Sequence, residues 1–276
     1  MWWGCPVSKP VRVGLFGWPV AHSISPAMHN AGFRAAKLNW HYEALAIPPD
    51  RLADEVARYV GEGFRGFNVT IPHKRAALDL PQIAEISDAA QAIGAANTLA
   101  VRPDGTLSAD NTDWEGFTRD LRMYRIQPDQ LNCLILGTGG SADAVVYALE
   151  QLNARSITRV SRSPDGRPDV IGYDALADAA PSANLVINCT PLGMSPGVDR
   201  SPWPDDVPLP DNAMLYDLVY NPPVTALMRR FQQAGLRMFG GLGMLVWQGA
   251  LAWPRWTDTP PPVDIMFAAA RAALQP

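Results

Sequence analysis

Cysteine is scarce in this chain, which holds only Cys5, Cys133 and Cys189 among 276 residues, and no two of them form a CxxC pair. Disulfide-stabilised secreted domains need more cysteines, and zinc ribbons need closely spaced ones. The stretch from Met1 to Pro6 also lacks the charged and long apolar regions of a signal peptide. These absences predict a protein of the reducing cytoplasm.

Basic runs, long apolar runs and metal-binding motifs are missing as well. The formal net charge is −4 without a basic cluster, so no nucleic-acid partner is expected. The longest uncharged stretch, Met238 to Pro254, is shorter than the ~20 residues of a membrane helix and contains four glycines, so no membrane partner is expected. No metal is predicted, because HExxH or similar spacing is absent among His22, His29, His41 and His73.

The composition that remains is globular, with 47% hydrophobic and 18% charged residues. A chain of this length can bury a large core and is expected to form two domains. In its second half, helical segments separate short apolar segments of strand type, at residues 132–136, 157–160, 184–189, 213–218 and 236–239. This alternation predicts an α/β fold with a doubly wound sheet.

A candidate catalytic group follows a short predicted strand in the first half. The strand, which includes Phe67 and Val69, stops at Pro72, because proline cannot donate to a strand ladder. His73 and Lys74 come directly after it. Ligands of open α/β sheets bind beyond the carboxyl ends of strands, so Lys74 is a candidate for chemistry, although a solvated loop lysine would look the same. His73 is expected to be a loop or packing residue.

Further polar residues fall at predicted strand ends or turns of the same half. A set of this kind suits a small, hydroxyl-rich ligand; its members are Ser23, Ser25, Thr70, Lys74, Asn97 and Asp113. Ser25 is also expected to cap a helix that Pro26 begins. Two more helices are predicted at residues 74–80 and 83–93, and a last amphipathic helix, near residues 263–274, is expected to pack on the first domain.

A glycine loop marks a dinucleotide site in the second half. The apolar run from Asn132 to Leu136 leads into Gly137-Thr138-Gly139-Gly140-Ser141-Ala142, which matches G-x-G-x-x-A and precedes a helical segment. These glycines allow a tight turn and let a pyrophosphate approach the helix N-terminus. The motif is specific here because the strand before it and the helix after it are both predicted.

The next predicted strand indicates which dinucleotide is bound. It ends at Ser161-Arg162-Ser163, where an NAD site usually carries an acidic residue for the ribose 2′-hydroxyl. An arginine between hydroxyls suits a 2′-phosphate, so NADP is predicted. Asp143, in the first turn of the glycine-loop helix, would repel that phosphate if it faced the same pocket, and NAD remains possible for that reason.

Taken together, these motifs resemble the shikimate dehydrogenase family, whose members reduce 3-dehydroshikimate to shikimate. The resemblance extends from Val13 to about Leu274. It rests on motifs in the family's order, namely residues 17–19, 22–30, 68–74, 94–99, 110–113, 188–194, 216–220 and 241–248.

The resemblance implies a role for each matching residue. Lys74 would be the catalytic lysine and Asp113 its carboxylate partner. The substrate would be bound by Ser23, Ser25, Thr70, Asn97, Tyr220 and Gln248. The cofactor would be bound by Gly137, Thr138, Gly139, Gly140 and Ser141 at the pyrophosphate, by Ser161, Arg162 and Ser163 at the adenosine phosphate, and by Thr190, Leu218, Gly241 and Met244 at the nicotinamide.

The family fold would give a discontinuous open-sheet substrate domain, residues 1–114 with 247–276, and a Rossmann-like NADP domain, residues 115–246, with the cofactor in the cleft between them. The expected partner is a small molecule, and the expected state is a monomer or homodimer. Two departures from the family pattern are Ser161-Arg162-Ser163 for Asn-Arg-Thr and Asp143 for an arginine common among members. An NAD-dependent quinate or shikimate dehydrogenase and a non-catalytic dinucleotide-binding regulator are the alternatives, although a regulator should have lost Lys74 or Asp113.

Overall fold

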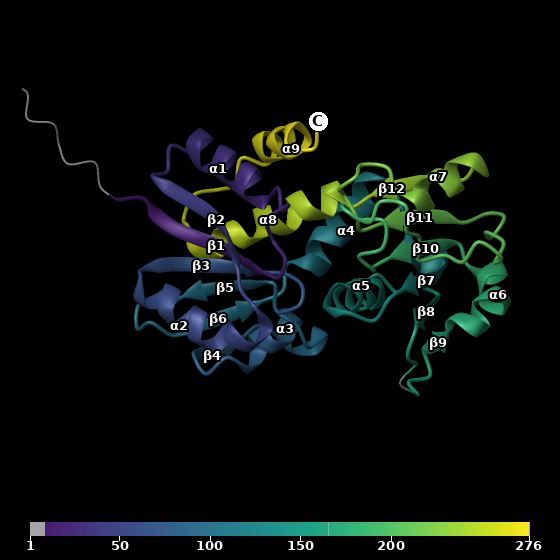
Figure 1. Cartoon of the computed structure of the whole chain (residues 1–276), viewed down its shortest axis with the longest axis horizontal. Coiled ribbons are helices and arrows are strands. Elements are labelled where there is room, and N and C mark those ends of the chain that lie inside the picture. Colours follow the sequence, from purple (N-terminus) through teal and green to yellow (C-terminus); the bar gives the residue numbers. More distant parts are fainter. Residues whose placement is uncertain (1–8, 165, 276) are drawn as a thin grey trace, which may run out of the picture. The chain divides into compact units, whose positions relative to one another are not determined.

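A computed structural model describes residues 9–164 and 166–275, which form two compact units (Figure 1). The first unit holds the described residues up to Thr112 together with Gly249–Gln275, and the second holds Asp113–Gln248. The boundaries predicted from the sequence, after residues 114 and 246, stay a prediction. Cys5 and the stretch from Met1 to Pro6 lie outside the described residues.

The first unit is built on a six-stranded sheet of order β2-β1-β3-β5-β6-β4. Its central strands pair in parallel, but β5 runs antiparallel to both β3 and β6. The strands are β1 (Val11–Gly17), β2 (Trp40–Ala46), β3 (Phe64–Val69), β4 (Ile83–Ile86), β5 (Thr98–Val101) and β6 (Leu107–Asp110). Because β5 runs in the opposite direction, it starts at the end of the sheet where β3 and β6 terminate. Polar residues predicted from the sequence follow the strands at this end of the sheet.

Helices complete the first unit: α1 (Ser25–Ala35), α2 (Leu52–Gly61), α3 (Asp88–Ile93), α9 (Val263–Ala272) and the second half of α8 (Leu242–Trp256). The last helix, α9, packs on α1, as the sequence predicts. The end of α8 lies against β5 and β3: the Trp256 indole donates to the Leu99 carbonyl of β5 at 3.0 Å, and it passes over Gly66 of β3. A Cβ on Gly66 would lie 2.2 Å from that indole nitrogen, so this close approach requires glycine.

The second unit has an all-parallel sheet of order β12-β11-β10-β7-β8-β9. Counted from its own first strand, this is the order 3-2-1-4-5-6 of dinucleotide-binding folds, with the switch point between β7 and β10. The strands are β7 (Asn132–Leu136), β8 (Ser156–Ser161), β9 (Val170–Gly172), β10 (Leu185–Asn188), β11 (Met214–Asp217) and β12 (Met238–Gly240), and the helices are α4 (Asp113–Met123), α5 (Gly140–Gln151), α6 (Leu176–Ala179) and α7 (Ala226–Gln233). The predicted α/β fold class, with an open sheet and a Rossmann-like domain, is confirmed.

The helices predicted at 74–80 and 83–93 are wrong in part. The first is a short 3₁₀ helix, Ala76–Asp79, and the second stretch divides into the strand β4 and the helix α3. Ser87 causes the division, because its extended backbone ends the strand and its hydroxyl accepts from the Ala90 N–H at 3.1 Å, which caps α3. Local apolar spacing did not reveal this cap.

Neither of the two cysteines in the described ranges is in a disulfide; Cys133 is buried and Cys189 half-buried. Over those same ranges, no helix combines the length and the apolar character that crossing a bilayer requires.

Candidate active site

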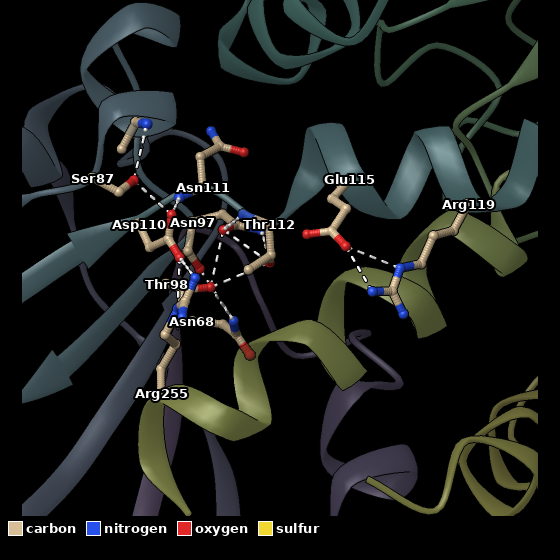
Figure 2. A network of polar contacts seen from close by, with 11 residues as sticks. Asn68, Ser87, Asn97, Thr98, Asp110, Asn111, Thr112, Glu115, Arg119 and Arg255 are labelled. Carbon is tan, nitrogen blue, oxygen red and sulfur yellow. Dashed lines mark hydrogen bonds and ion pairs between the residues drawn. The ribbon is translucent and has the colours of Figure 1, made fainter. Parts of the chain in front are cut away.

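Three neighbouring strands of the first unit, β3, β5 and β6, place polar side chains at one end of its sheet, where β3 and β6 terminate (Figure 2). Asn68 pairs with Thr98 across β3 and β5, and Thr98 pairs with Asp110 across β5 and β6. Asn97 and Thr112 lie next to these positions in the chain. All five residues belong to one hydrogen-bond network, which Asp110 joins by accepting the Asn97 N–H at its main-chain carbonyl. The register of the antiparallel β5 therefore brings together residues that are far apart in the sequence.

Asn97 is the centre of this network and is buried, with 2% of its surface exposed. Its amide oxygen accepts from the Thr112 N–H at 2.8 Å and from the Thr98 hydroxyl at 3.0 Å, and its amide nitrogen donates to the Thr112 hydroxyl at 3.0 Å. Asn97 thus fixes the main chain one residue before Asp113. This positioning role was not evident from the sequence.

Asp110 anchors helix α8 to the same end of the sheet. Its carboxylate accepts from Ser87 at 2.6 Å and from the Asn111 N–H at 2.8 Å, and it pairs with Arg255 at 2.5 Å. The Asn111 side chain donates to the Ala95 carbonyl at 2.8 Å. Sequence reasoning missed Ser87 and Arg255, since no local motif links them to Asp110.

Lys74 follows β3 in a tightly held turn and is half-buried. The Thr70 N–H donates to the Phe16 carbonyl at 2.8 Å, and the His73 N–H donates to the Thr70 carbonyl at 2.9 Å. The Ala96 N–H donates to the Lys74 carbonyl at 2.8 Å, so the main chain of Lys74 lies beside the segment that carries Asn97. The structure therefore brings Lys74 and Thr70 to the same end of the sheet as the Asn97 network.

His73 serves packing, as predicted. It is 1% exposed, and its Nε2 lies 2.8 Å from the Ile47 carbonyl oxygen, which makes that nitrogen the donor. Burial lowers the pKa of His73, against a smaller raising effect of this hydrogen bond. Burial and this hydrogen bond commit the ring to the fold.

The predicted cap at Ser25 is wrong. Helix α1 begins at Ser25 itself, Ile24 precedes it, and no side chain of that preceding residue caps the helix. Instead, the Ser23 hydroxyl accepts from the Ser25 N–H at 3.2 Å. Ser23 therefore holds the turn after β1, and the Ser25 side chain, 5% exposed, is not needed as a cap.

The glycine loop of the second unit lies at the switch point of its sheet. Gly137 has a φ of +109°, a conformation that favours glycine, and a Cβ there would also lie 3.2 Å from the Thr190 side chain. Gly139 immediately precedes α5, and a Cβ on it would meet no atom within 4 Å. This open space over a helix N-terminus fits the pyrophosphate of a dinucleotide.

The loop after β8 supplies the expected basic group. Arg162 and Ser163 are exposed, and Ser161 is half-buried. The Ser161 hydroxyl donates to the Ser163 carbonyl at 3.1 Å and accepts from the Ser163 N–H at 3.2 Å. This hydroxyl shapes the loop around Arg162, whose guanidinium is accessible and fits a phosphate.

The predicted nicotinamide residues lie near the carboxyl ends of β10, β11 and β12. Asn188 accepts from both the N–H and the hydroxyl of Thr190, at 2.9 and 2.8 Å, and donates to Asp217 at 2.9 Å. Asp217 also accepts from the Val219 N–H at 3.0 Å, which fixes the chain after Leu218. Burial raises the pKa of Asp217 to about 6, against the opposing effect of these donors. Asn188 and Asp217 are positioning residues that sequence reasoning missed.

A second buried carboxyl holds the start of α8. Asp120 accepts from the Tyr216 hydroxyl at 2.6 Å and from the Met244 N–H, and a Cβ on Gly243 would lie 1.9 Å from its carboxylate. An acceptor at a helix N-terminus is stabilising. Burial raises the pKa of Asp120 to about 6. Burial also raises the pKa of Tyr216, and the neighbouring Asp120 carboxylate raises it further. Asp120 fixes the turn that carries Met244.

Gln248 and Tyr220 are the remaining predicted site residues. Gln248 is 9% exposed, and its amide donates to the Leu245 carbonyl at 2.7 Å. A Cβ on Gly116 would lie 2.8 Å from the Gln248 nitrogen, so α4 and α8 cross closely there. Tyr220 is half-buried beyond the end of β11.

We expect Asp120→Asn to flatten the dependence of stability on pH. Native Asp120 binds its proton more tightly than an unfolded aspartate of pKa about 3.9 does. Its stabilising contribution is therefore complete below about pH 4 and is lost as pH rises through about 6, by about 2–3 kcal/mol in total. Urea unfolding of wild type and variant between pH 4.5 and 7.5 measures this difference, and two parallel profiles would contradict it.

Two family models match parts of the chain. Residues 15–99 match the shikimate dehydrogenase substrate binding domain, and residues 241–271 match the shikimate 5'-dehydrogenase C-terminal domain.

The chain is similar over nearly its whole length to known proteins. It is 38% identical to a shikimate dehydrogenase (NADP(+)) of Symbiobacterium thermophilum, over 96% of each chain. It is 34% identical to a shikimate 5-dehydrogenase of Thermus thermophilus solved with NADP(H) and shikimate, with a TM-score of 0.84 over 96% of this chain and 100% of that one. A structure from Listeria monocytogenes, a shikimate 5-dehydrogenase with shikimate and NAD, is 27% identical, with a TM-score of 0.80 over 94% of this chain and 96% of that one. The chain belongs to the shikimate dehydrogenase family.

Proposed function

We propose that this protein is an oxidoreductase that reversibly reduces 3-dehydroshikimate to shikimate with NADP, a step of aromatic amino-acid biosynthesis. Family membership supports the reaction. For this chain, the observation that carries the proposal is the polar end of the first sheet, where Lys74 and the Asn97 network lie beyond the ends of neighbouring strands. Hydroxyl, amide and ammonium groups in this arrangement suit a small ligand with several hydroxyls.

Lys74 handles the proton in this proposal. When bound, the dinucleotide supplies the hydride that reduces the C3 ketone and accepts it in the reverse direction. Negative charge develops on the ketone oxygen, and Lys74 stabilises that charge and delivers a proton to the oxygen, directly or through water. Asp113 is the carboxylate that acts together with Lys74.

Substrate binding is assigned to polar side chains that the sequence analysis singled out. Ser23, Ser25, Thr70 and Asn97 bind the ring hydroxyls and the carboxylate. Tyr220 and Gln248 keep the substrate-binding roles that the family implies. Asn97 has a second task in this proposal, since the same amide positions Thr112.

Three segments of the second unit are proposed to hold the dinucleotide. The pyrophosphate is bound by Gly137, Thr138, Gly139, Gly140 and Ser141, and the 2′-phosphate by Ser161, Arg162 and Ser163. The nicotinamide is lined by Thr190, Leu218, Gly241 and Met244. We also expect a cytoplasmic protein that acts as a monomer or homodimer, which light scattering after gel filtration can measure.

The dinucleotide assignment is tested by Gly139→Ala. A methyl group there meets no protein atom within 4 Å, and the φ of −84° suits alanine, so the melting temperature should not fall. The methyl enters the space given to the pyrophosphate, so the Kd for NADP⁺ should rise about tenfold or more. Isothermal titration calorimetry measures this change.

Gly61→Ala is the matched control, because a Cβ on Gly61, at the end of α2, also meets nothing within 4 Å. It should leave the Kd for NADP⁺ unchanged. If Gly139→Ala bound NADP⁺ as tightly as Gly61→Ala does, the pyrophosphate would have to lie elsewhere.

A further inference from the structure

A buried arginine lies between two carboxylates beside the glycine loop. Arg159 of β8 is only 8% exposed at its side chain. Its Nη1 lies 3.3 Å from Asp143 Oδ1, and its Nη2 lies 2.5 Å from Asp169 Oδ2. Its Nε also donates to Asp169 at 2.6 Å. The guanidinium thus joins the first turn of α5 to the segment that leads into β9.

This cluster of Asp143, Arg159 and Asp169 lies next to both segments that are proposed to hold phosphates. Arg159 pairs in register with Ile135 of β7, two residues before Gly137. Ser161, two residues after Arg159, projects to the same face of β8, because strand side chains alternate. Figure 1 shows α5 alongside β7 and β8. The cluster is therefore close to both the glycine loop and the loop that carries Arg162.

The charges of the cluster matter for an anion in this place. Asp143 is 13% exposed at its side chain, so water screens its charge poorly. A carboxylate in the first turn of α5 would oppose the phosphates that the helix N-terminus favours. Arg159 adds a positive charge in contact with that carboxylate, which lowers the repulsion.

Resting on the proposed function, we infer that Arg159 is a specificity-determining residue that offsets part of the charge of Asp143 and so permits the 2′-phosphate of NADP. Arg159 acts through Asp143 and does not need to touch the cofactor. Arg162 supplies the direct phosphate contact. The inference explains how an NADP site can tolerate a carboxylate, Asp143, in the first turn of α5.

A purely structural ion pair would behave differently. If Arg159 only joined α5 to β8, its loss would lower stability and weaken both dinucleotides to the same extent. If it offsets the charge of Asp143, its loss weakens the binding of NADP⁺ selectively, because only NADP⁺ carries the 2′-phosphate. The ratio of the two dissociation constants separates these roles.

The experiment measures Kd for NADP⁺ and NAD⁺ by titration calorimetry, without turnover, in wild type, Arg159→Met and the double variant Arg159→Met with Asp143→Ala. Methionine keeps much of the apolar stem without the charge. We expect Arg159→Met to raise the Kd for NADP⁺ about tenfold and that for NAD⁺ less than about threefold. The double variant should return the NADP⁺ value to within about threefold of wild type.

Two variants keep the test decisive if Arg159→Met folds poorly. Asp143→Ala alone removes the repulsive carboxylate and should shift preference toward NADP⁺ by about threefold or more. Asp169→Asn removes the competing carboxylate from Arg159 and should therefore not lower the preference for NADP⁺. Melting temperatures of all variants show that the folded protein is compared.

An unchanged ratio of the two Kd values in Arg159→Met, or no recovery in the double variant, would overturn the inference alone. Failure of the wild type to bind NADP⁺ more tightly than NAD⁺ would overturn the proposed cofactor and the inference together.

Discussion

Replacing Lys74 with alanine is expected to lower kcat by roughly 10²–10⁴ while the affinity for NADP⁺ survives. The loss follows from the charge that forms on the ketone oxygen during hydride transfer. Without the ammonium, that charge has neither its electrostatic partner nor its proton donor. The glycine loop belongs to the other unit and should bind the dinucleotide as before.

The Ala96 N–H donates to the Lys74 carbonyl, and this main-chain hydrogen bond is kept when alanine replaces lysine. Lys74→Arg separates the two roles of the side chain. Arginine keeps the charge, but it does not give up its proton near neutral pH. Partial recovery of kcat in Lys74→Arg would point to electrostatic stabilisation, and no recovery would point to proton delivery or to exact ammonium placement.

Lys9→Ala provides the matched control, since it removes the same group at an exposed position. It should keep wild-type kcat and KM. A Lys74→Ala enzyme with near-normal kcat would remove Lys74 from the mechanism.

Gly241→Ala is expected to destabilise the second unit and to weaken NADP⁺ binding strongly. A Cβ on Gly241 would lie 2.2 Å from the Leu218 carbonyl oxygen and 2.5 Å from its carbon. These are backbone atoms, so no side-chain rotation can relieve the overlap, and either α8 or the chain after β11 must move. We expect a loss of about 3 kcal/mol or more of unfolding free energy, and a melting temperature lower by roughly 6–12 °C.

Gly240→Ala, one residue earlier, is the control for this prediction. A Cβ on Gly240 would lie 3.7 Å from Met228 and 3.8 Å from the Pro223 carbonyl, which are ordinary contacts. Its stability should stay within about 1 kcal/mol of wild type. Thermal unfolding and NADP⁺ titration of both variants provide the comparison; equal behaviour would mean that the contact between Gly241 and Leu218 does not constrain the site.

Local sequence signals predicted the elements that carry the site. Strand Asn132–Leu136 has the boundaries expected from the apolar run that precedes Gly137. The glycine loop could be located because strand, turn and helix signals occur together within about twenty residues. Lys74 could be placed after a strand because Pro72 ends the ladder.

Contacts between distant residues could not be predicted in this way. Arg255 and Asp110 are 145 residues apart, and Tyr216 and Asp120 are 96 apart, so no local pattern relates them. Asp143 is the clearest case. The sequence marked it as an acid in an anion site, but only the fold shows the guanidinium of Arg159 beside it.

The central claim, NADP-dependent oxidation of shikimate, is tested most directly by initial rates of the wild-type enzyme with each pairing of shikimate or quinate with NADP⁺ or NAD⁺. We predict the highest kcat/KM for shikimate with NADP⁺ and a lower KM for NADP⁺ than for NAD⁺. Equal or higher efficiency with quinate, or a lower KM for NAD⁺, would contradict the account, and absence of turnover in all four pairings would reject an enzymatic role in this reaction.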